Sequence, residues 1–99
     1  MKTYTVYYAM EPNFGYGPKP ELASLFITHK KVKRLEAHDL GEVFYTMQGE
    51  IWSPNGEARP LIRSLGLHHT SMSVGDVILD DEDHIYYLVE PVGFSELRA

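Results

Sequence analysis

A neighbouring pair of histidines is the first feature of this sequence that could do chemistry. His68 and His69 lie between Glu57 upstream and Asp76 downstream, and imidazole and carboxylate groups are the ligands that zinc and similar divalent metals prefer. Adjacent residues of a strand point to opposite faces, however, so both rings would rarely reach one ion. No further histidine follows at the spacing of one helical turn. We therefore expect no metal site and no bound cofactor.

Two serines close to His69 raise the question of nucleophilic catalysis. Ser71 or Ser73 would need an activated hydroxyl, a base and an oriented acid, all in contact. The surrounding residues do not form the Gly-x-Ser-x-Gly turn that presents a nucleophilic serine. A hydrogen-bonded structural role for His69, beside Thr70 and Ser71, is the simpler interpretation. The sequence therefore favours a protein that is not an enzyme, and we predict no catalytic residue.

A short basic segment, residues 29–34, could contact phosphate groups. In a strand, Lys31 and Lys33 would share one face, with Lys30 and Arg34 on the other, which divides the charge. In a helix, Lys30, Lys33 and Arg34 would cluster on one side. The net charge of −5 argues against strong nonspecific DNA binding. Nucleic-acid binding by these four residues is therefore the alternative function.

The acidic residues gather in the other half of the chain. Residues 1–49 hold six Lys/Arg and five Asp/Glu, a net charge of +1, whereas residues 50–99 hold three and nine, a net charge of −6. Such polarity suits a charged partner or head-to-tail contacts, although two solvated surfaces would have the same composition. One acidic cluster could engage a basic nucleic-acid-binding surface by mimicking DNA. It consists of Asp80, Asp81, Glu82 and Asp83.

Aromatic and arginine side chains supply the remaining candidates for partner binding, because Trp, Tyr and Arg are favoured as interface anchors. The only tryptophan stands in a turn segment, and two aromatic residues stand in the proline- and glycine-rich loop 11–20. The alternative for the tryptophan is a place in the core beside Phe44. The candidate anchors are Trp52, Arg59, Arg63, Phe14 and Tyr16.

The elements that would position these residues are mainly strands. Residues 3–10 are β-branched and aromatic, which predicts a strand with Val6 and Tyr8 on one face and Tyr7 on the other. Residues 25–35 fit either a helix or a strand, and we favour the strand. The clearest helix covers 39–48, with Asp39 as its N-cap and a carboxylate three residues later, and residue 49 is a glycine that could end it.

The second half of the chain predicts a short helix and a closing hairpin. Ser53 could cap a helix over residues 57–65, in which Pro60 falls within the first turn. Residues 71–79 and 84–89 are expected as strands joined by the acidic turn, with residues 91–94 bending the chain back. These elements predict an α+β fold, a small and mainly antiparallel sheet packed against one or two helices. The 99 residues are expected to form one domain.

Composition sets the expected environment. There is no cysteine, which excludes disulfides and thiol chemistry. No apolar run approaches the roughly 20 residues of a membrane span, and the first residues lack a signal-peptide pattern. We therefore expect a cytoplasmic protein that does not enter the membrane. A sheet this small also leaves an exposed edge, so a homodimer formed by strand pairing is an open alternative.

Three segments resemble a known group of proteins. Residues 42–50, residues 52–59 and the Ser-x-Ser-Val-Gly-Asp-Val run within 69–77, followed by Tyr86-Tyr87 and Gly93-Phe94, are similar to small uncharacterised proteins of phages, plasmids and other mobile elements, loosely of the YodL-like type. This resemblance implies an N-terminal strand pair, a central helix and a C-terminal hairpin. It implies no activity. Our main hypothesis is a non-enzymatic interaction domain, an accessory factor of a phage or plasmid that acts on a host protein.

Overall fold

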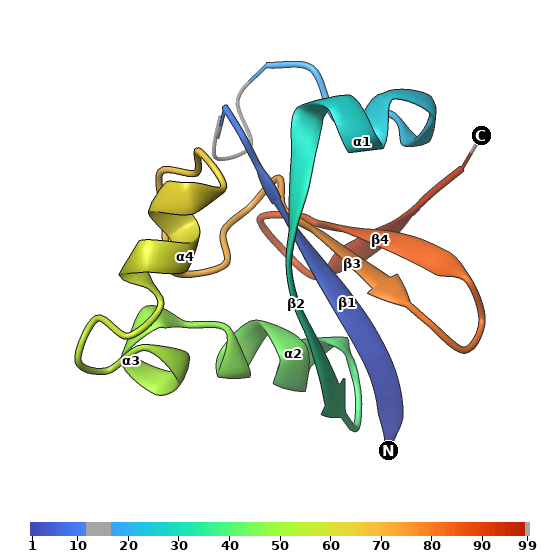
Figure 1. The fold of residues 1–99 in the computed structure, drawn as a ribbon. Helices are drawn as coiled ribbons and strands as arrows, with labels where there is room; N and C mark the ends of the chain where they lie inside the picture. The colour runs from blue at the N-terminus through green and yellow to red at the C-terminus, as the bar shows by residue number, and fades with distance from the viewer. Residues whose placement is uncertain (12–16, 99) are drawn as a thin grey trace.

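The computed structural model describes residues 1–11 and 17–98 and contains a five-stranded antiparallel sheet with short helices (Figure 1). The strands are β1 (Lys2–Ala9), β2 (His29–Ala37), β3 (Val77–Asp80), β4 (Ile85–Val89) and β5 (Phe94–Leu97), in the spatial order β2-β1-β3-β4-β5. The predicted α+β class is therefore confirmed. The helices are η1 (Leu22–Ser24), α1 (Leu25–Thr28), α2 (Leu40–Thr46), α3 (Gly49–Trp52) and α4 (Arg59–Ser64). Within the described part of the chain, no helix has the length and apolar character needed to cross a membrane.

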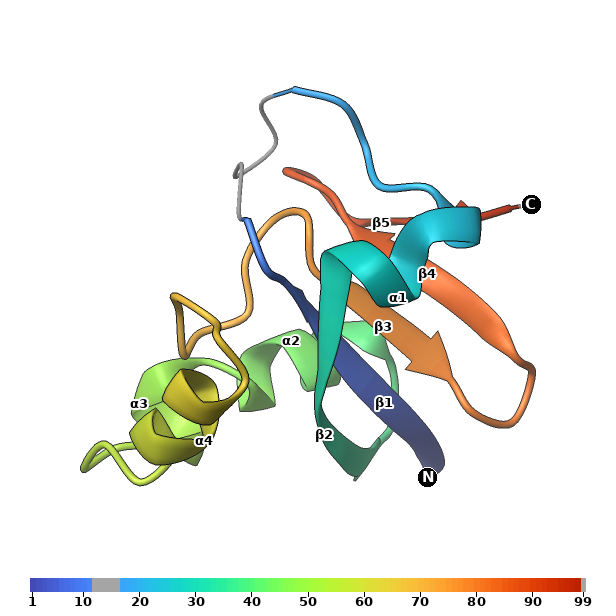
Figure 2. The ribbon, with the colours of Figure 1, turned by 45° about the horizontal axis from the view of Figure 1, so that its top comes forward.

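Alternate residues of β1 build two separate cores, as their spacing predicted. Val6 and Tyr8 belong to the core that α2 and α4 cover, whereas Tyr7 belongs to the core that α1 covers (Figure 2). The main core consists of the buried residues Tyr4, Val6, Tyr8, Val32, Ala37, Val43, Met47, Ile62, Leu67, Met72, Ile78 and Val89. The second core consists of Tyr7, Leu25, Val77 and Leu88.

The segment 25–35, for which we favoured a strand, contains both structures. Leu25–Thr28 is a single helical turn, and β2 begins at His29. The strand prediction was wrong for the first four residues because tertiary packing decides their conformation. The turn places Leu25 fully inside the second core, and one turn can bury only one side of a helix. Its neighbours Phe26 and Ile27 are therefore left exposed.

The capping signal at residue 39 is confirmed, but the expected end of the helix is not. The Asp39 carboxylate accepts a hydrogen bond from the backbone N–H of Glu42 at 2.8 Å, and the Glu42 carboxylate accepts one from the backbone N–H of His38 at 2.9 Å. Gly49, expected to end the helix, instead begins α3. Its N–H donates to the Ser71 hydroxyl at 2.7 Å, which starts a new turn.

The two later predictions of bounds need correction. The expected helix 57–65 is present only as Arg59–Ser64, although the Ser53 hydroxyl does accept from the N–H of Ala58, at 2.8 Å, just before it. The expected strand 71–79 begins only at Val77, because the Asp76 side chain draws the preceding backbone into a turn. Strand β5 was not predicted, since it has only four residues directly after the bend at residues 91–93.

Candidate functional site

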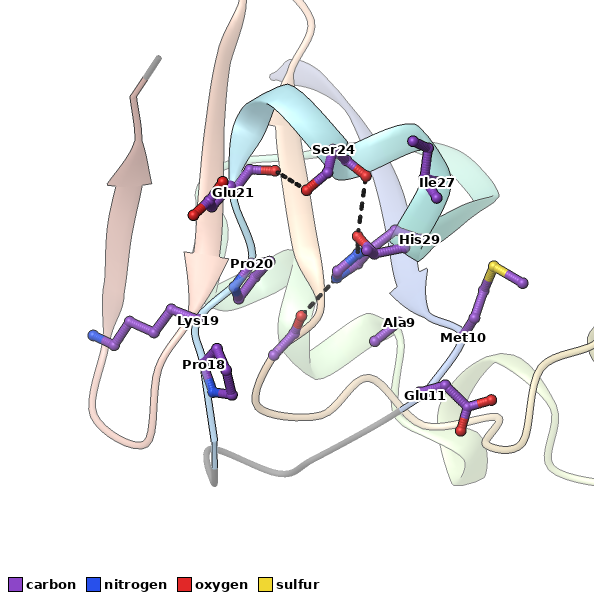
Figure 3. A pocket seen from close by; sticks show the side chains of 12 residues that line it. Ala9, Met10, Glu11, Pro18, Lys19, Pro20, Glu21, Ser24, Ile27 and His29 are labelled. Carbon is purple, nitrogen blue, oxygen red and sulfur yellow. Dashed lines mark hydrogen bonds between the residues drawn. The ribbon is translucent and has the colours of Figure 1, made fainter.

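A cavity of about 500 Å³ lies at the end of the sheet where β1 stops and α1 begins (Figure 3). Its volume falls in the range of roughly 300–1,000 Å³ that is typical of ligand pockets. The walls come from the end of β1, the strap 18–21, α1 and the turn at Gly75. Apolar side chains make up much of this lining, namely Ala9, Met10, Pro18, Pro20 and Ile27. The cavity can therefore accept an apolar group.

One wall of this cavity is held by His29, which is buried. With the proton on Nε2, the ring donates to the Gly75 carbonyl at 2.8 Å, and Nδ1 accepts from the Thr28 hydroxyl at 2.8 Å (Figure 3). Both nitrogens are thus engaged in fixing the start of β2 to the turn before β3. The imidazole therefore shapes the cavity and leaves no free nitrogen for proton transfer.

Helix α1 continues this cavity onto the outer surface. Ile27 lines the cavity and is 78% exposed, and its neighbour Phe26 is 66% exposed. The Phe26 ring meets Tyr7 edge-on, with 5.8 Å between ring centroids, and it lies 6.3 Å from Tyr86. We call the cavity together with Phe26 and Ile27 the α1 surface. These two adjacent exposed apolar side chains beside a cavity form a candidate contact surface.

The basic residues lie on β2, which is an edge strand of the sheet. The register shifts at Val32, where β2 carries an additional residue. Lys30 and Lys33 consequently lie opposite β1 residues of the main core, whereas Lys31 and Arg34 lie opposite residues of the other face. The predicted pairing of faces was wrong, because strict alternation does not hold across a bulge. The positive charge is divided between the two faces, as expected for a strand, but the pairs of residues that share a face differ from the predicted pairs.

The acidic turn is held against the start of β1. The Lys2 ammonium donates to Asp80 at 2.6 Å and to Asp83 at 2.7 Å. Burial raises the pKa of the Asp80 carboxyl, but hydrogen bonds from Lys2 and from two backbone N–H groups of the turn outweigh that effect, so this pKa lies below its ordinary value. The same two carboxylates raise the pKa of the Lys2 ammonium.

The other two carboxylates of this turn are also engaged. Asp81 accepts from the Arg34 guanidinium at 2.9 Å and from the Thr5 hydroxyl at 2.8 Å, and Glu82 accepts from the backbone N–H of Thr3 at 3.2 Å. A partner surface made of these residues stays a prediction. Two cations, Lys2 and Arg34, already offset half of its four negative charges, which reduces its value for binding a basic partner.

The predicted interface anchors on α3 and α4 differ in how far their side chains are exposed. Trp52 is half-buried, packs against the main core as Phe44 does, and donates its indole N–H to the Thr70 carbonyl at 3.1 Å. This is the geometry of the core alternative. Arg59 and Arg63 are exposed on α4 and form no ion pair with any residue that the structure describes.

The His69 ring contacts a carboxylate through one nitrogen and stacks on an aromatic ring. Its Nε2 lies 3.0 Å from Asp76, and its ring stacks on Tyr8 with 4.7 Å between centroids. Asp76 also accepts from the backbone N–H of Ala9 at 2.9 Å and from that of Ser73 at 2.8 Å. The histidine therefore has a hydrogen-bonded structural position, with Asp76 as its partner. The unit ties the end of β1 to the turn that precedes β3.

The remaining residues that suggested chemistry are not assembled into a reactive site. His68 is exposed, and Glu57 accepts from the N–H of Asn55 at 2.6 Å. The Ser71 hydroxyl accepts from a backbone N–H, and the Ser73 hydroxyl donates to the Ser71 carbonyl at 3.3 Å. Across residues 1–11 and 17–98, no group of three His, Asp or Glu side chains is placed to hold a metal ion.

Sequence reasoning did not find the α1 surface. The available signal was the apolar pair Phe26-Ile27 beside a proline-rich loop, but it could not show that both side chains are exposed. The predicted anchors Phe14 and Tyr16 lie outside the described residues. Comparison with protein-family models, with curated proteins and with solved structures identified no similar protein.

Proposed function

We propose that this protein is a non-enzymatic interaction domain that binds a partner protein through the α1 surface. The observation that carries the proposal is the exposure of Phe26 and Ile27 directly beside a cavity with largely apolar walls. Isolated exposed apolar side chains are common, but adjacent ones at a cavity mark contact sites. The engaged nitrogens of His29 support binding in preference to catalysis.

The physical basis would be burial of apolar surface by one anchoring side chain of the partner. An apolar side chain that enters the cavity would cover Ile27 and Met10, and the partner backbone would cover Phe26. Complete burial of one such side chain contributes about 1.5–3 kcal/mol. One filled cavity and one covered aromatic ring are therefore enough for the central contact of an interface, with polar groups such as the Lys19–Glu90 pair at its rim.

The resemblance to YodL-like proteins of mobile elements suggests the biological setting. We propose that the partner is a host protein and that the chain is an accessory factor of a phage or plasmid. The candidate Trp52 lies on α3, and Arg59 and Arg63 lie on α4. The acidic residues Asp80–Asp83 lie near the start of β1, whereas the α1 surface lies near its end. These candidates would extend such an interface only where the partner is large.

The test begins with capture of a binding partner from lysate of the bacterial host, followed by titration of the isolated partner. A Phe26→Ser/Ile27→Ser variant should lose most of the affinity, about 2–4 kcal/mol, because the apolar contact is removed. Val92→Ser is the matched control, since Val92 is 92% exposed elsewhere on the chain. Equal affinity of the double variant and the control would overturn the proposal.

Nucleic-acid regulation through Lys30, Lys31, Lys33 and Arg34 remains the second proposal. It is supported by the first three of these side chains, which are exposed and form no ion pair with the described residues. Binding to an oligonucleotide should then weaken steeply as salt rises. A lack of binding at low salt would exclude it.

A further inference from the structure

Strand β2 presents a long open edge. It spans His29–Ala37 and pairs with β1 on one side only, because it stands first in the order of the sheet. No backbone hydrogen bond joins its outer side to another element among the described residues. An edge of this kind offers a row of free N–H and C=O groups to any extended chain that fits beside it.

Three lysines that form no ion pair with any described residue lie along this edge, on both faces. Lys30 and Lys33 lie on the face of the main core and Lys31 on the other, because of the bulge at Val32. A ligand that lies flat on one face would meet two of these lysines at most. A strand added at the edge has side chains on both faces and would meet all three.

We infer that the β2 edge binds an extended acidic segment of a partner protein as a sixth strand of the sheet. Backbone hydrogen bonds would supply affinity, and carboxylates on both faces of the segment would supply specificity through the three lysines. The inference rests on the proposed function, since it assumes a protein partner, but it names a second contact and its chemistry. Arg34 is excluded from this role because Asp81 already holds it.

The same charges argue against the other occupants of the edge. Two copies joined through β2 would bring lysines opposite lysines, and like charges opposite each other across strands are destabilising. Lysines on an edge are indeed a common device against unselective strand pairing. Duplex nucleic acid would approach from one face and leave part of the charge unused. An acidic strand is the ligand that uses both the backbone and all three ammonium groups.

The experiment uses a nine-residue peptide of Val, Thr and Glu, with glutamates on both faces, titrated into the full chain. Two derivatives carry N-methyl groups on one or the other set of alternate residues, which removes alternate N–H donors without changing the charge. In a strand pair only one set faces β2. We expect one derivative to bind like the parent and the other to lose binding. Amides of β2 should become protected from hydrogen exchange when the parent binds.

Charge variants test the specificity. Lys30→Gln/Lys31→Gln/Lys33→Gln should weaken binding about tenfold, since three exposed ion pairs are lost and each contributes modestly. Arg98→Gln, which changes an exposed cation beyond β5, is the control and should bind normally. The triple Lys→Glu variant should prefer a peptide in which lysines replace the glutamates.

Three results would overturn the inference. They are equal binding of both N-methyl derivatives, protection of β5 or α1 in place of β2, and binding of an oligonucleotide but not of the peptide. The Phe26→Ser/Ile27→Ser variant separates this inference from the proposed function, because it should still bind the peptide. The wild type could fail to bind the peptide while binding of its natural partner is still weakened by Phe26→Ser/Ile27→Ser. That result would overturn the edge site and leave the proposed function standing.

Discussion

The replacement Asp76→Ala tests whether the histidine–aspartate unit is structural. The Asp76 side chain is almost fully buried, and it accepts from the N–H groups of Ala9 and Ser73 besides contacting His69. The alanine variant leaves these donors without a partner. Each buried unsatisfied donor costs about 1–3 kcal/mol, and the N–H of Ser73 is only partly buried. We therefore expect the free energy of unfolding to fall by about 3–4 kcal/mol, a large share of the 5–15 kcal/mol of an average domain.

Urea unfolding, followed by circular dichroism and by the fluorescence of the single tryptophan, measures this loss. The slope against urea should stay unchanged, so that the shift of the midpoint reports stability. Asp76→Asn keeps the shape and one acceptor and should lose less. Asp83→Ala is the control, because its surface ion pair with Lys2 is exposed and should contribute about 1 kcal/mol or less. A loss below about 1 kcal/mol for Asp76→Ala would refute the reasoning.

Two further predictions concern the acidic turn and the tryptophan. The pKa of Asp80 is lowered in the fold, so its contribution to stability is present above its ordinary value of 3.8 and is lost as the pH falls through the folded value. Acid titration between about pH 5 and pH 2 should therefore destabilise the wild type more steeply than Asp80→Asn; parallel curves would contradict this. Trp52→Phe removes the hydrogen bond to Thr70. The free energy of unfolding should therefore fall by about 1 kcal/mol, and the melting temperature should fall with it. If Trp52 were only an interface anchor, the variant would be as stable as the wild type and only its binding to the partner would weaken.

The parts of the fold that the sequence predicted depend on local rules. The alternation in β1 shows directly which side chains share a face, and Asp39 satisfies a helix N–H three residues away. The acidic turn joins two apolar strands, as expected, and the second of them, Ile85–Val89, is within one residue of its predicted length. In each of these cases the deciding interaction lies within a few residues, so the pattern carries the information.

The parts that could not be predicted depend on distant residues. Leu25 adopts a helical turn because the second core receives its side chain, and that core includes Val77 and Leu88. Residues 71–76 leave the strand because the Asp76 carboxylate binds the N–H groups of Ala9 and Ser73. The bulge in β2 has no composition signal, yet it changes which lysines share a face. Such contacts exist only after the sheet has formed.

The candidate sites follow the same division. The acidic cluster was correctly seen as a turn, but its partners Lys2 and Thr5 are more than 70 residues away in the chain. Those contacts engage carboxylates that the sequence alone presents as free, and Lys2 with Arg34 offsets half of their charge. The α1 surface was missed for the converse reason. Phe26 and Ile27 were expected to pack as part of a strand, and only the short helix leaves them exposed.

The two faces of the sheet are covered by helices to different extents, and this difference explains why the α1 surface and the β2 edge lie next to each other. Helices α2 and α4 cover the main core, whereas within residues 1–11 and 17–98 only the short segment Leu22–Thr28 covers the second. The exposed helix α1 leads directly into β2, so the α1 surface and the free edge adjoin along the chain. One partner segment that used both would depend on both. Ile27→Ser and Lys31→Gln would then each weaken binding of that same partner, with losses that add where the two side chains do not touch, whereas with two independent partners each variant would weaken binding of only one.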